Sequence, residues 1–261
     1  MPLLSVAIVT FNEEANLART LASVAPLFSG MPGEIIVVDS HSTDRTAEIA
    51  RTHNATVIAR DWPGFAEQKN FAIAQCTGEW VLSLDADEEL TPELATEIHI
   101  LLNSNPTTSA FYLKRRNLFL GHWIKHGGFY PDAKLRLFRR TAAAQFTPRA
   151  VHEVIAFDGP TATLTHDLVH HAYPTLATYI EHMDRYSTLS SDILVAKGRT
   201  SRALPAFIAN VAIFPALTFI KNYVFRLGFL DGREGLLQHL YHSVYASWKY
   251  AKAWEQSHPK R

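Results

Sequence analysis

The sequence predicts an α/β fold, a mostly parallel sheet with helices on both faces, followed by a helical C-terminal region. In the first hundred residues, short apolar runs rich in β-branched residues alternate with amphipathic stretches of helical length, which is typical of βαβ units. From Leu176 to the end, apolar residues recur at helical spacing instead. A chain of 261 residues, 47% of them hydrophobic, is long enough for one substantial core.

The predicted strands and helices alternate in order along the first part of the chain. Each strand is a short apolar run, and each stretch between strands has the 3.6-residue period of a helix. We expect strands at residues 4–9, 35–38, 56–59 and 80–84, and helices at residues 14–24, 43–53 and 65–75. A further helix begins at Thr91-Pro92, because threonine suits the N-cap and proline suits the first helical position.

The alternation ends after about residue 110. Residues 115–135 are aromatic and rich in turn formers around Gly127-Gly128, so we expect ordered loops over a site there. Near the C-terminus, one helix is expected to carry an apolar face. That face consists of Leu237, Leu240, Tyr241, Val244, Tyr245 and Trp248.

Charge and cysteine content limit the classes of function. Lys and Arg number 25, as do Asp and Glu, so the whole chain has no strong attraction for nucleic acid. Residues 197–261 nevertheless hold ten basic and three acidic residues, and a phospholipid surface is one candidate partner for this basic tail. Cys76 is the only cysteine, which excludes an internal disulfide and fits a reducing compartment. The first five residues lack the basic region of a signal peptide, so we expect a cytoplasmic protein.

Polar clusters follow three of the predicted strands. They lie at residues 10–14, 39–44 and 85–89. Ligands of a parallel sheet bind beyond the carboxyl ends of its strands, so these clusters are expected to converge in one cleft.

The third cluster contains two carboxylates, Asp85 and Asp87, at a strand end. With this spacing both can reach a hard cation such as Mn²⁺ or Mg²⁺. The alternative is an acidic turn that only caps the next helix.

Asp39, in the second cluster, could likewise either cap a helix or bind a ligand. Ser42 and Asp44 already suit the capping role, which leaves Asp39 free to accept hydrogen bonds from a ligand.

Two common nucleotide-binding motifs are absent from the sequence. No Gly-x-Gly-x-x-Gly follows the first strand, which argues against a hydride-transfer enzyme. No Gly-x-x-x-x-Gly-Lys-Ser/Thr loop is present, which argues against an ATPase or kinase of that class.

Four segments of the first part resemble family 2 glycosyltransferases, which have the GT-A fold. The match departs at Ser40 and His41, where the family more often has Asp-Gly. The matching segments are residues 5–14, 37–44, 68–70 and 78–87.

The later part resembles the subgroup of β-glycosyltransferases that builds bacterial lipopolysaccharide core. The matching pieces are residues 127–132, 134–138, 151–153, 170–173 and 229–232. The resemblance implies a GT-A catalytic domain at 1–175, with a nucleotide-sugar half at 1–110 and an acceptor half at 111–175. Residues 176–261 would form the helical C-terminal region.

The resemblance also implies roles for particular residues. Asp87 would bind Mn²⁺ or Mg²⁺, and His170 would complete the metal site unless it is a structural histidine beside His166 and His171. Asp85 would bind the ribose or assist the metal. The residues assigned to nucleotide binding are Thr10, Asn12, Glu14, Asp39, Lys69 and Asp85.

The resemblance implies an inverting transfer, in which a metal offsets charge on the leaving diphosphate and a general base takes the proton of the acceptor hydroxyl. Glu153 is the expected base and Asp132 the reserve, although Glu153 could instead pair with Arg149. Arg136, together with Arg139 and Arg140, could contact acceptor phosphates or form a solvated face.

The expected function is therefore sugar transfer from a nucleotide-diphosphate donor, such as a UDP-sugar, to a glycan or lipid-linked acceptor such as lipopolysaccharide core. The alternative is a non-catalytic, membrane-attached protein that binds nucleotide sugars or glycans. Residues 203–220 are uncharged and at the lower length limit for a membrane span, so we expect peripheral contact with an anionic membrane. The alternatives are a membrane span, and ordinary packing or a dimer interface. The expected location is the inner face of the bacterial inner membrane.

Overall fold

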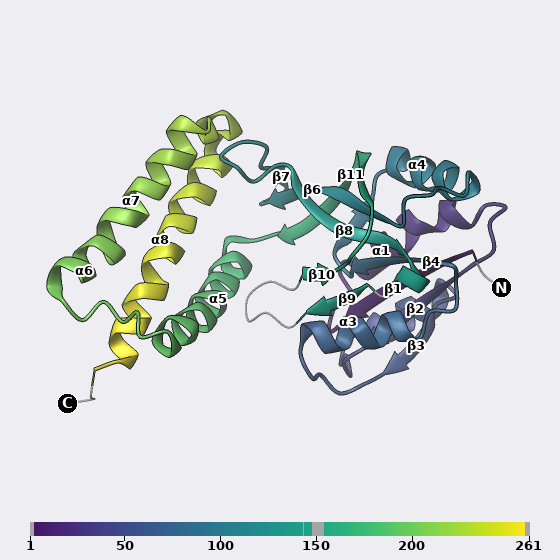
Figure 1. Ribbon diagram of the computed structural model, residues 1–261, viewed down its shortest axis with the longest axis horizontal. Coiled ribbons are helices and arrows are strands. Elements are labelled where there is room, and N and C mark those ends of the chain that lie inside the picture. The colour runs from purple at the N-terminus through teal and green to yellow at the C-terminus, as the bar shows by residue number, and fades with distance from the viewer. Residues whose placement is uncertain (1–2, 143, 148–153, 259–261) are drawn as a thin grey trace. The chain divides into compact units, whose positions relative to one another are not determined.

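The computed structural model describes residues 3–142, 144–147 and 154–258, and these residues divide into two compact units (Figure 1). The first unit contains the described residues of 3–116, 132–147 and 154–171. The second contains residues 117–131 and 172–258.

A mixed sheet contains most of the strands, in the order β3-β2-β1-β4-β8-β6-β11-β5, with β7 paired to β6. The pairs β3–β2, β2–β1 and β1–β4 are parallel, while β4–β8, β8–β6 and β11–β5 are antiparallel. A separate antiparallel pair consists of β9 (Gln145–Thr147) and β10 (Val154–Ala156). The strands of the large sheet are β1 (Leu4–Thr10), β2 (Gly33–Asp39), β3 (Thr56–Ala59), β4 (Trp80–Asp85), β5 (Glu88–Leu90), β6 (Ala110–Phe119), β7 (His122–Trp123), β8 (Asp132–Arg139) and β11 (Thr161–Tyr173).

The four strands expected from the sequence are present, and the α/β class is confirmed. The expectation of loops throughout 115–135 is wrong at both ends, because β6 continues to Phe119 and β8 begins at Asp132. Residues of β6 pair with β8 as far as Arg115, opposite Asp132. Consecutive basic residues at 114–116 hid the end of this strand from a reading of hydrophobic pattern.

Helices of the first unit cover both faces of the sheet. On β1, Val6 and Ile8 pack with residues of α1, α2 and α4, while Ala7 packs with residues of α3 and β9. This alternation follows from the two-residue period of a strand, and burial of each large aliphatic side chain contributes about 1.5–3 kcal/mol. The helices are α1 (Leu17–Val24), α2 (Thr46–Thr52), α3 (Phe65–Ala74) and α4 (Pro92–Asn103), with short 3-10 turns η1 (Ala25–Phe28) and η2 (Arg140–Ala142).

Helix starts differ in how well the sequence predicts them. Helix α4 begins as expected, because the Thr91 hydroxyl accepts a hydrogen bond from the Leu94 amide at 3.2 Å. Helices α1 and α2 begin three residues later than expected. Before α2, the Asp44 carboxylate accepts from the Thr46 amide at 3.0 Å and so stabilises a turn outside the helix.

The second unit contains three long helical segments, and α8 lies between α5 and the segment formed by α6 and α7 (Figure 1). In the middle of that segment, Pro215 has no amide hydrogen to give to the carbonyl of Val211. The Ser247 hydroxyl on α8 donates to that carbonyl instead, at 2.7 Å. The segments are α5 (Leu176–Ala196), α6 (Leu204–Ile208), π-helical η3 (Ala209–Ile213), α7 (Phe214–Phe219), π-helical η4 (Ile220–Phe225), the 3-10 turn η5 (Gly228–Asp231) and α8 (Gly232–Gln256).

Four of the six residues expected on the apolar face of α8 pack into one apolar cluster, whereas Val244 is half-buried and is not among the residues of that cluster. Leu237, Tyr241, Tyr245 and Trp248 pack against a cluster that includes Tyr179 of α5. Leu240 is 44% exposed, so its inclusion in the face is wrong. At about 100° per residue, Leu240 lies outside the stripe formed by the four residues that pack into the cluster.

Candidate active site

Two loops at the carboxyl ends of β1 and β2 are bound to each other. The Asn12 amide donates to the Ser42 hydroxyl at 2.8 Å, and the Asn12 side-chain oxygen accepts from the Thr43 amide at 2.8 Å. Asn12 has a φ of 54°, a left-handed conformation that asparagine tolerates better than most residues. Glu14 accepts from the Arg45 amide at 3.1 Å. Asn12 and Glu14 therefore hold the loops in place, and their contact with a nucleotide stays a prediction.

The strand tips carry Thr10 and Asp39 side by side. These residues are aligned in the parallel pairing of β1 with β2, and both are buried. The carboxylate of Asp39 is not free of protein contacts as expected, because it accepts from the Ser42 amide at 2.9 Å and from its hydroxyl at 2.5 Å. The Thr10 hydroxyl is buried and has no hydrogen-bond partner within the described part of the chain. A buried hydroxyl of this kind is a natural contact for a bound ligand.

The Asp85 carboxylate lies between two cations. Its Oδ1 atom is 2.6 Å from Lys69 Nζ, and its Oδ2 atom is 2.5 Å from Arg136 Nη2. Burial alone would raise the pKa of Asp85, but Arg136 and then Lys69 hold that pKa well below its ordinary value. Asp85 is therefore an ionised carboxylate whose negative charge is balanced by two protein cations.

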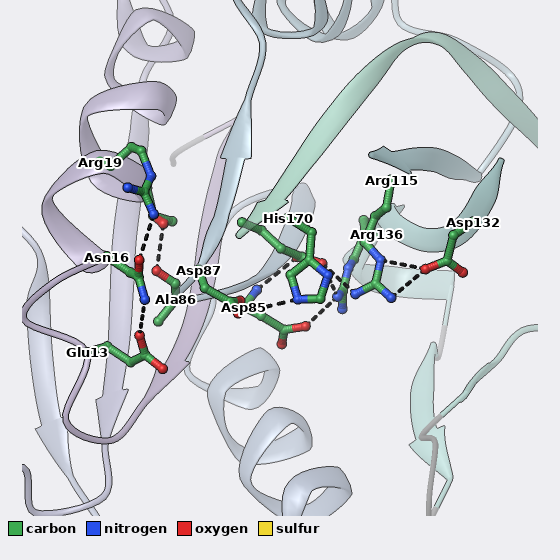
Figure 2. A network of polar contacts seen from close by, with 12 residues as sticks. Glu13, Asn16, Arg19, Asp85, Ala86, Asp87, Arg115, Asp132, Arg136 and His170 are labelled. Carbon is green, nitrogen blue, oxygen red and sulfur yellow. Dashed lines mark hydrogen bonds and ion pairs between the residues drawn. The ribbon is translucent and has the colours of Figure 1, made fainter. Parts of the chain in front are cut away.

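A buried glutamate extends the same network. Glu88 is completely buried and lies 2.6 Å from Arg136 and 3.2 Å from Arg115. Its second oxygen accepts a hydrogen bond from the Asp85 amide at 3.0 Å. Arg115 also pairs with Asp132 at 2.6 Å, so the network connects Asp85 at the end of β4 with Asp132 at the start of β8 (Figure 2).

Asp87 faces a histidine from another strand. Its Oδ2 atom lies 3.3 Å from Nε2 of His170 (Figure 2). The pairing of β11 with β5 produces this contact, because it places His170 opposite Glu88 and lets the His171 amide donate to the Asp87 carbonyl at 3.0 Å. Burial would raise the pKa of Asp87, but His170 lowers it.

This pair fits a divalent metal that accepts both oxygen and nitrogen ligands. Asp87 supplies a carboxylate, His170 supplies an imidazole, and both side chains keep some exposure to solvent, at 23% and 17%. No group of three or more His, Cys, Asp or Glu side chains suited to a metal occurs among the described residues. A metal held here would thus take two protein ligands and leave positions for ligand oxygens.

Of the two candidate bases, Asp132 lies within the described residues and Glu153 does not. Asp132 pairs with Arg115, and also with Lys134 at 2.9 Å. Burial would raise the pKa of Asp132, but Arg115 and Lys134 hold it far below its ordinary value. Glu153 and its alternative partner Arg149 lie outside the described residues.

Two residues of the candidate site, Arg136 and Glu13, were not recognised from the sequence. Arg136 was expected to contact acceptor phosphates or solvent, yet it is 4% exposed and bound between carboxylates, which corrects that expectation. Its position between leucines in a buried strand is the signal that could have shown this. Glu13 is the second residue. Burial raises its pKa, and so do the nearby charges of Asp87, Asp44 and Asp85, although a hydrogen bond from Asn16 opposes the shift.

The fold and this site together define a glycosyltransferase of the GT-A type. The family described as Glycosyl transferase family 2 matches residues 5–155, more than half of the chain. The chain belongs to this family, which confirms the resemblance drawn from its motifs.

Relatives with similar sequences extend beyond the family segment. An uncharacterized glycosyltransferase of Rickettsia typhi is 32% identical over 243 residues, which cover 89% of this chain and 81% of the relative. The lipopolysaccharide core biosynthesis glycosyltransferase LpsC of Rhizobium meliloti is 29% identical over 260 residues, which cover 97% and 92%.

Solved structures show the same fold at low sequence identity. The mannosyltransferase PcManGT from Pyrobaculum calidifontis, in complex with GDP-Man and Mn²⁺, has a TM-score of 0.57 at 18% identity, covering 98% of this chain and 88% of its own. Glucosyl-3-phosphoglycerate synthase from Mycobacterium tuberculosis, in complex with Mn²⁺, UDP and glucosyl-3-phosphoglycerate, has a TM-score of 0.51 at 20% identity, covering 76% of this chain and 80% of its own.

Proposed function

We propose that the protein is an inverting glycosyltransferase that moves a sugar from a UDP-sugar to a glycan or lipid-linked acceptor such as lipopolysaccharide core. The observation that carries the proposal is the pair of carboxylates at the end of β4. One of them, Asp85, is neutralised by the protein, and the other, Asp87, faces His170. LpsC, a lipopolysaccharide core enzyme by name, supports the acceptor class.

The different surroundings of the two carboxylates support a metal at Asp87 rather than at Asp85. A cation at Asp85 would meet Lys69 and Arg136 at short range, and like charges repel. His170 can bind a metal through its neutral imidazole, because metal binding displaces the proton from such a ligand. Mn²⁺ accepts an imidazole ligand more readily than Mg²⁺, so we propose Mn²⁺ first and Mg²⁺ as the alternative.

The bound metal would offset the negative charge that develops on the leaving diphosphate. Mn²⁺ and UDP in the synthase structure, and Mn²⁺ with GDP-Man in the mannosyltransferase structure, support a metal-bound nucleotide in this fold. The protein's own part is to hold the nucleotide. Thr10 offers a buried hydroxyl that has no partner among the described residues, Asp39 its remaining lone pairs and Lys69 its charge near Asp85.

The acceptor hydroxyl must lose a proton as it attacks the sugar. We propose Glu153 as the base. Asp132 is the weaker candidate, because a carboxylate whose pKa is held far down by Arg115 and Lys134 accepts a proton poorly. Sugar donors are cytoplasmic in this proposal, and the acceptor lies at the inner face of the bacterial inner membrane.

Thermal unfolding with a panel of nucleoside diphosphates, with and without Mn²⁺, tests the donor site. A ligand at a hundred times its Kd stabilises the folded state by about 2.7 kcal/mol. We expect a UDP-dependent shift that requires Mn²⁺, is lost in Asp87→Ala and persists in the control Glu93→Ala, an exposed carboxylate on α4. No shift with any nucleotide would contradict the proposal. Binding without donor turnover would indicate the non-catalytic alternative.

A further inference from the structure

One helical segment of the second unit is unusually exposed for its composition. Leu204–Phe225 is 22 residues long, and only 6% of its most apolar window is buried. By length and composition alone it could cross a membrane. Single exposed apolar residues are ordinary, whereas a continuous row along a helix marks an interaction surface. The large apolar side chains of this row, each at least 42% exposed, are Leu204, Ile208, Ile213, Phe214, Leu217, Ile220, Val224 and Phe225.

The opposite side of the segment packs on α8. Phe207 contacts Trp254 with ring centroids 5.1 Å apart, and Tyr223 lies 6.0 Å from the ring of His239. Helix α8 is not apolar, since it carries charged residues at both ends, Arg233 and Lys252 among them. A segment that lies along such a helix cannot be surrounded by lipid on all sides, so this geometry favours a position in the plane of the membrane interface over a span.

A basic cavity lies at the N-terminal end of the segment. It has a volume of about 380 Å³ and is lined by Arg199, Arg202 and the loop residues between them, with Asn210 and Tyr250. Within the described part of the chain, neither arginine has an ion pair with a carboxylate. Burial lowers the pKa of the neighbouring Lys249, and repulsion from Arg199 lowers it further.

We propose that this face lies on an anionic phospholipid bilayer, with the apolar row at the acyl boundary and Arg199 and Arg202 on lipid phosphates. Charge identifies this occupant, because residues 197–261 hold ten basic and three acidic residues. Lys221, exposed near the other end of the row, can keep its ammonium in the headgroup layer while its stem covers apolar surface. The inference deepens the proposed function by giving the surface that a lipid-linked acceptor requires, but it rests on residues of the second unit alone.

Vesicle flotation tests the surface. The full chain is mixed with vesicles of phosphatidylcholine alone or of phosphatidylcholine with phosphatidylglycerol, at low and at physiological salt. We expect flotation with the anionic vesicles and loss of flotation in Ile213→Ser/Leu217→Ser. In Arg199→Gln/Arg202→Gln we expect binding weaker by roughly tenfold or more, in line with the contribution of basic residues near an anionic surface.

Matched controls come from the first unit. Ile100→Ser removes a side chain that is 63% exposed on α4, and Arg51→Gln removes an exposed arginine on α2. Both controls should float like the unmodified chain, and every variant should keep its far-UV circular dichroism. Retention of the UDP and Mn²⁺ thermal shift in the surface variants separates failure of this inference from failure of the proposed function.

Four results would overturn the inference. The first is absence of flotation with every vesicle composition, and the second is equal loss in the matched controls. The third is a dimer in sedimentation equilibrium without lipid that Leu217→Ser dissociates, because a second copy would then cover the row. The fourth is retention in membranes after alkaline carbonate extraction, which would indicate a span.

Discussion

Arg136 Nη2 lies 2.5 Å from Asp85 Oδ2, so the first carboxylate of the Asp85-Ala86-Asp87 motif is bound by a buried guanidinium from β8. Lys69 contacts the other oxygen of the same carboxylate. Two cations therefore satisfy Asp85 within the protein, while Asp87 has one histidine beside it. Because the two acids differ in charge environment, we expect Asp87 and not Asp85 to bind a metal.

Asp87→Asn should weaken Mn²⁺ binding by well over tenfold, because it removes a charged metal ligand. Asp85→Asn should leave Mn²⁺ affinity closer to that of the unmodified protein and chiefly destabilise the fold, because Lys69 and Arg136 lose a buried partner. Calorimetric titration of Mn²⁺ in the presence of UDP measures both affinities. Equal loss of Mn²⁺ affinity in the two variants would show that Asp85 is also a ligand.

Arg136→Met should lower the free energy of unfolding by about 3–5 kcal/mol, because it leaves the buried Asp85 and Glu88 short of a counter-charge. Urea unfolding at neutral pH measures this change. Arg45→Met is the control, since Arg45 pairs with Glu48 on the surface and its loss should have little effect. A similar stability of the two variants would mean that the Arg136 network contributes little.

Glu153→Gln should reduce kcat by about 10²–10⁴-fold while leaving nucleotide binding unchanged, as expected for loss of a general base. Asp132→Asn should reduce kcat much less and lower stability more, because Asp132 neutralises Arg115 and Lys134. Initial rates with a saturating donor, together with Mn²⁺-dependent UDP binding, separate the two effects. The opposite ranking of kcat would transfer the role of base to Asp132.

The sequence predicts the parallel part of the sheet well because its strands are nearly continuous apolar runs. It predicts the ends of elements less well where polar side chains stabilise turns, as Asp44 does before α2. The end of β6 was missed because consecutive arginines such as Arg115 and Arg116 are typical of a solvent-exposed loop when their partners are unknown. Their partners, Asp132 and Asp167, are distant in sequence.

The candidate site follows the same division. The rule that ligands bind at the carboxyl ends of parallel strands is enough to select Asp39, Asp85 and Asp87. Arg136 could not be assigned in this way, because its contact with Asp85 depends on how β8 pairs antiparallel to β4, 51 residues along the chain. His170 was reached only through the family resemblance, and the structure places it beside Asp87.

Stability should fall as the pH drops from about 6.5 to 4, because burial lowers the pKa of His242 from 6.5 to about 4, with smaller effects of His239 and Lys249. Between these values the unfolded chain binds a proton that the folded chain does not, so the free energy of unfolding decreases with falling pH. For His242 alone the decrease approaches about 3 kcal/mol, at 1.36 kcal/mol for each pKa unit. Urea unfolding at pH 7, 6 and 5 measures the slope, and His242→Gln should flatten it. An unchanged slope in His242→Gln would assign the acid sensitivity to other groups. His239 is the first of these to test, because burial lowers its pKa as well.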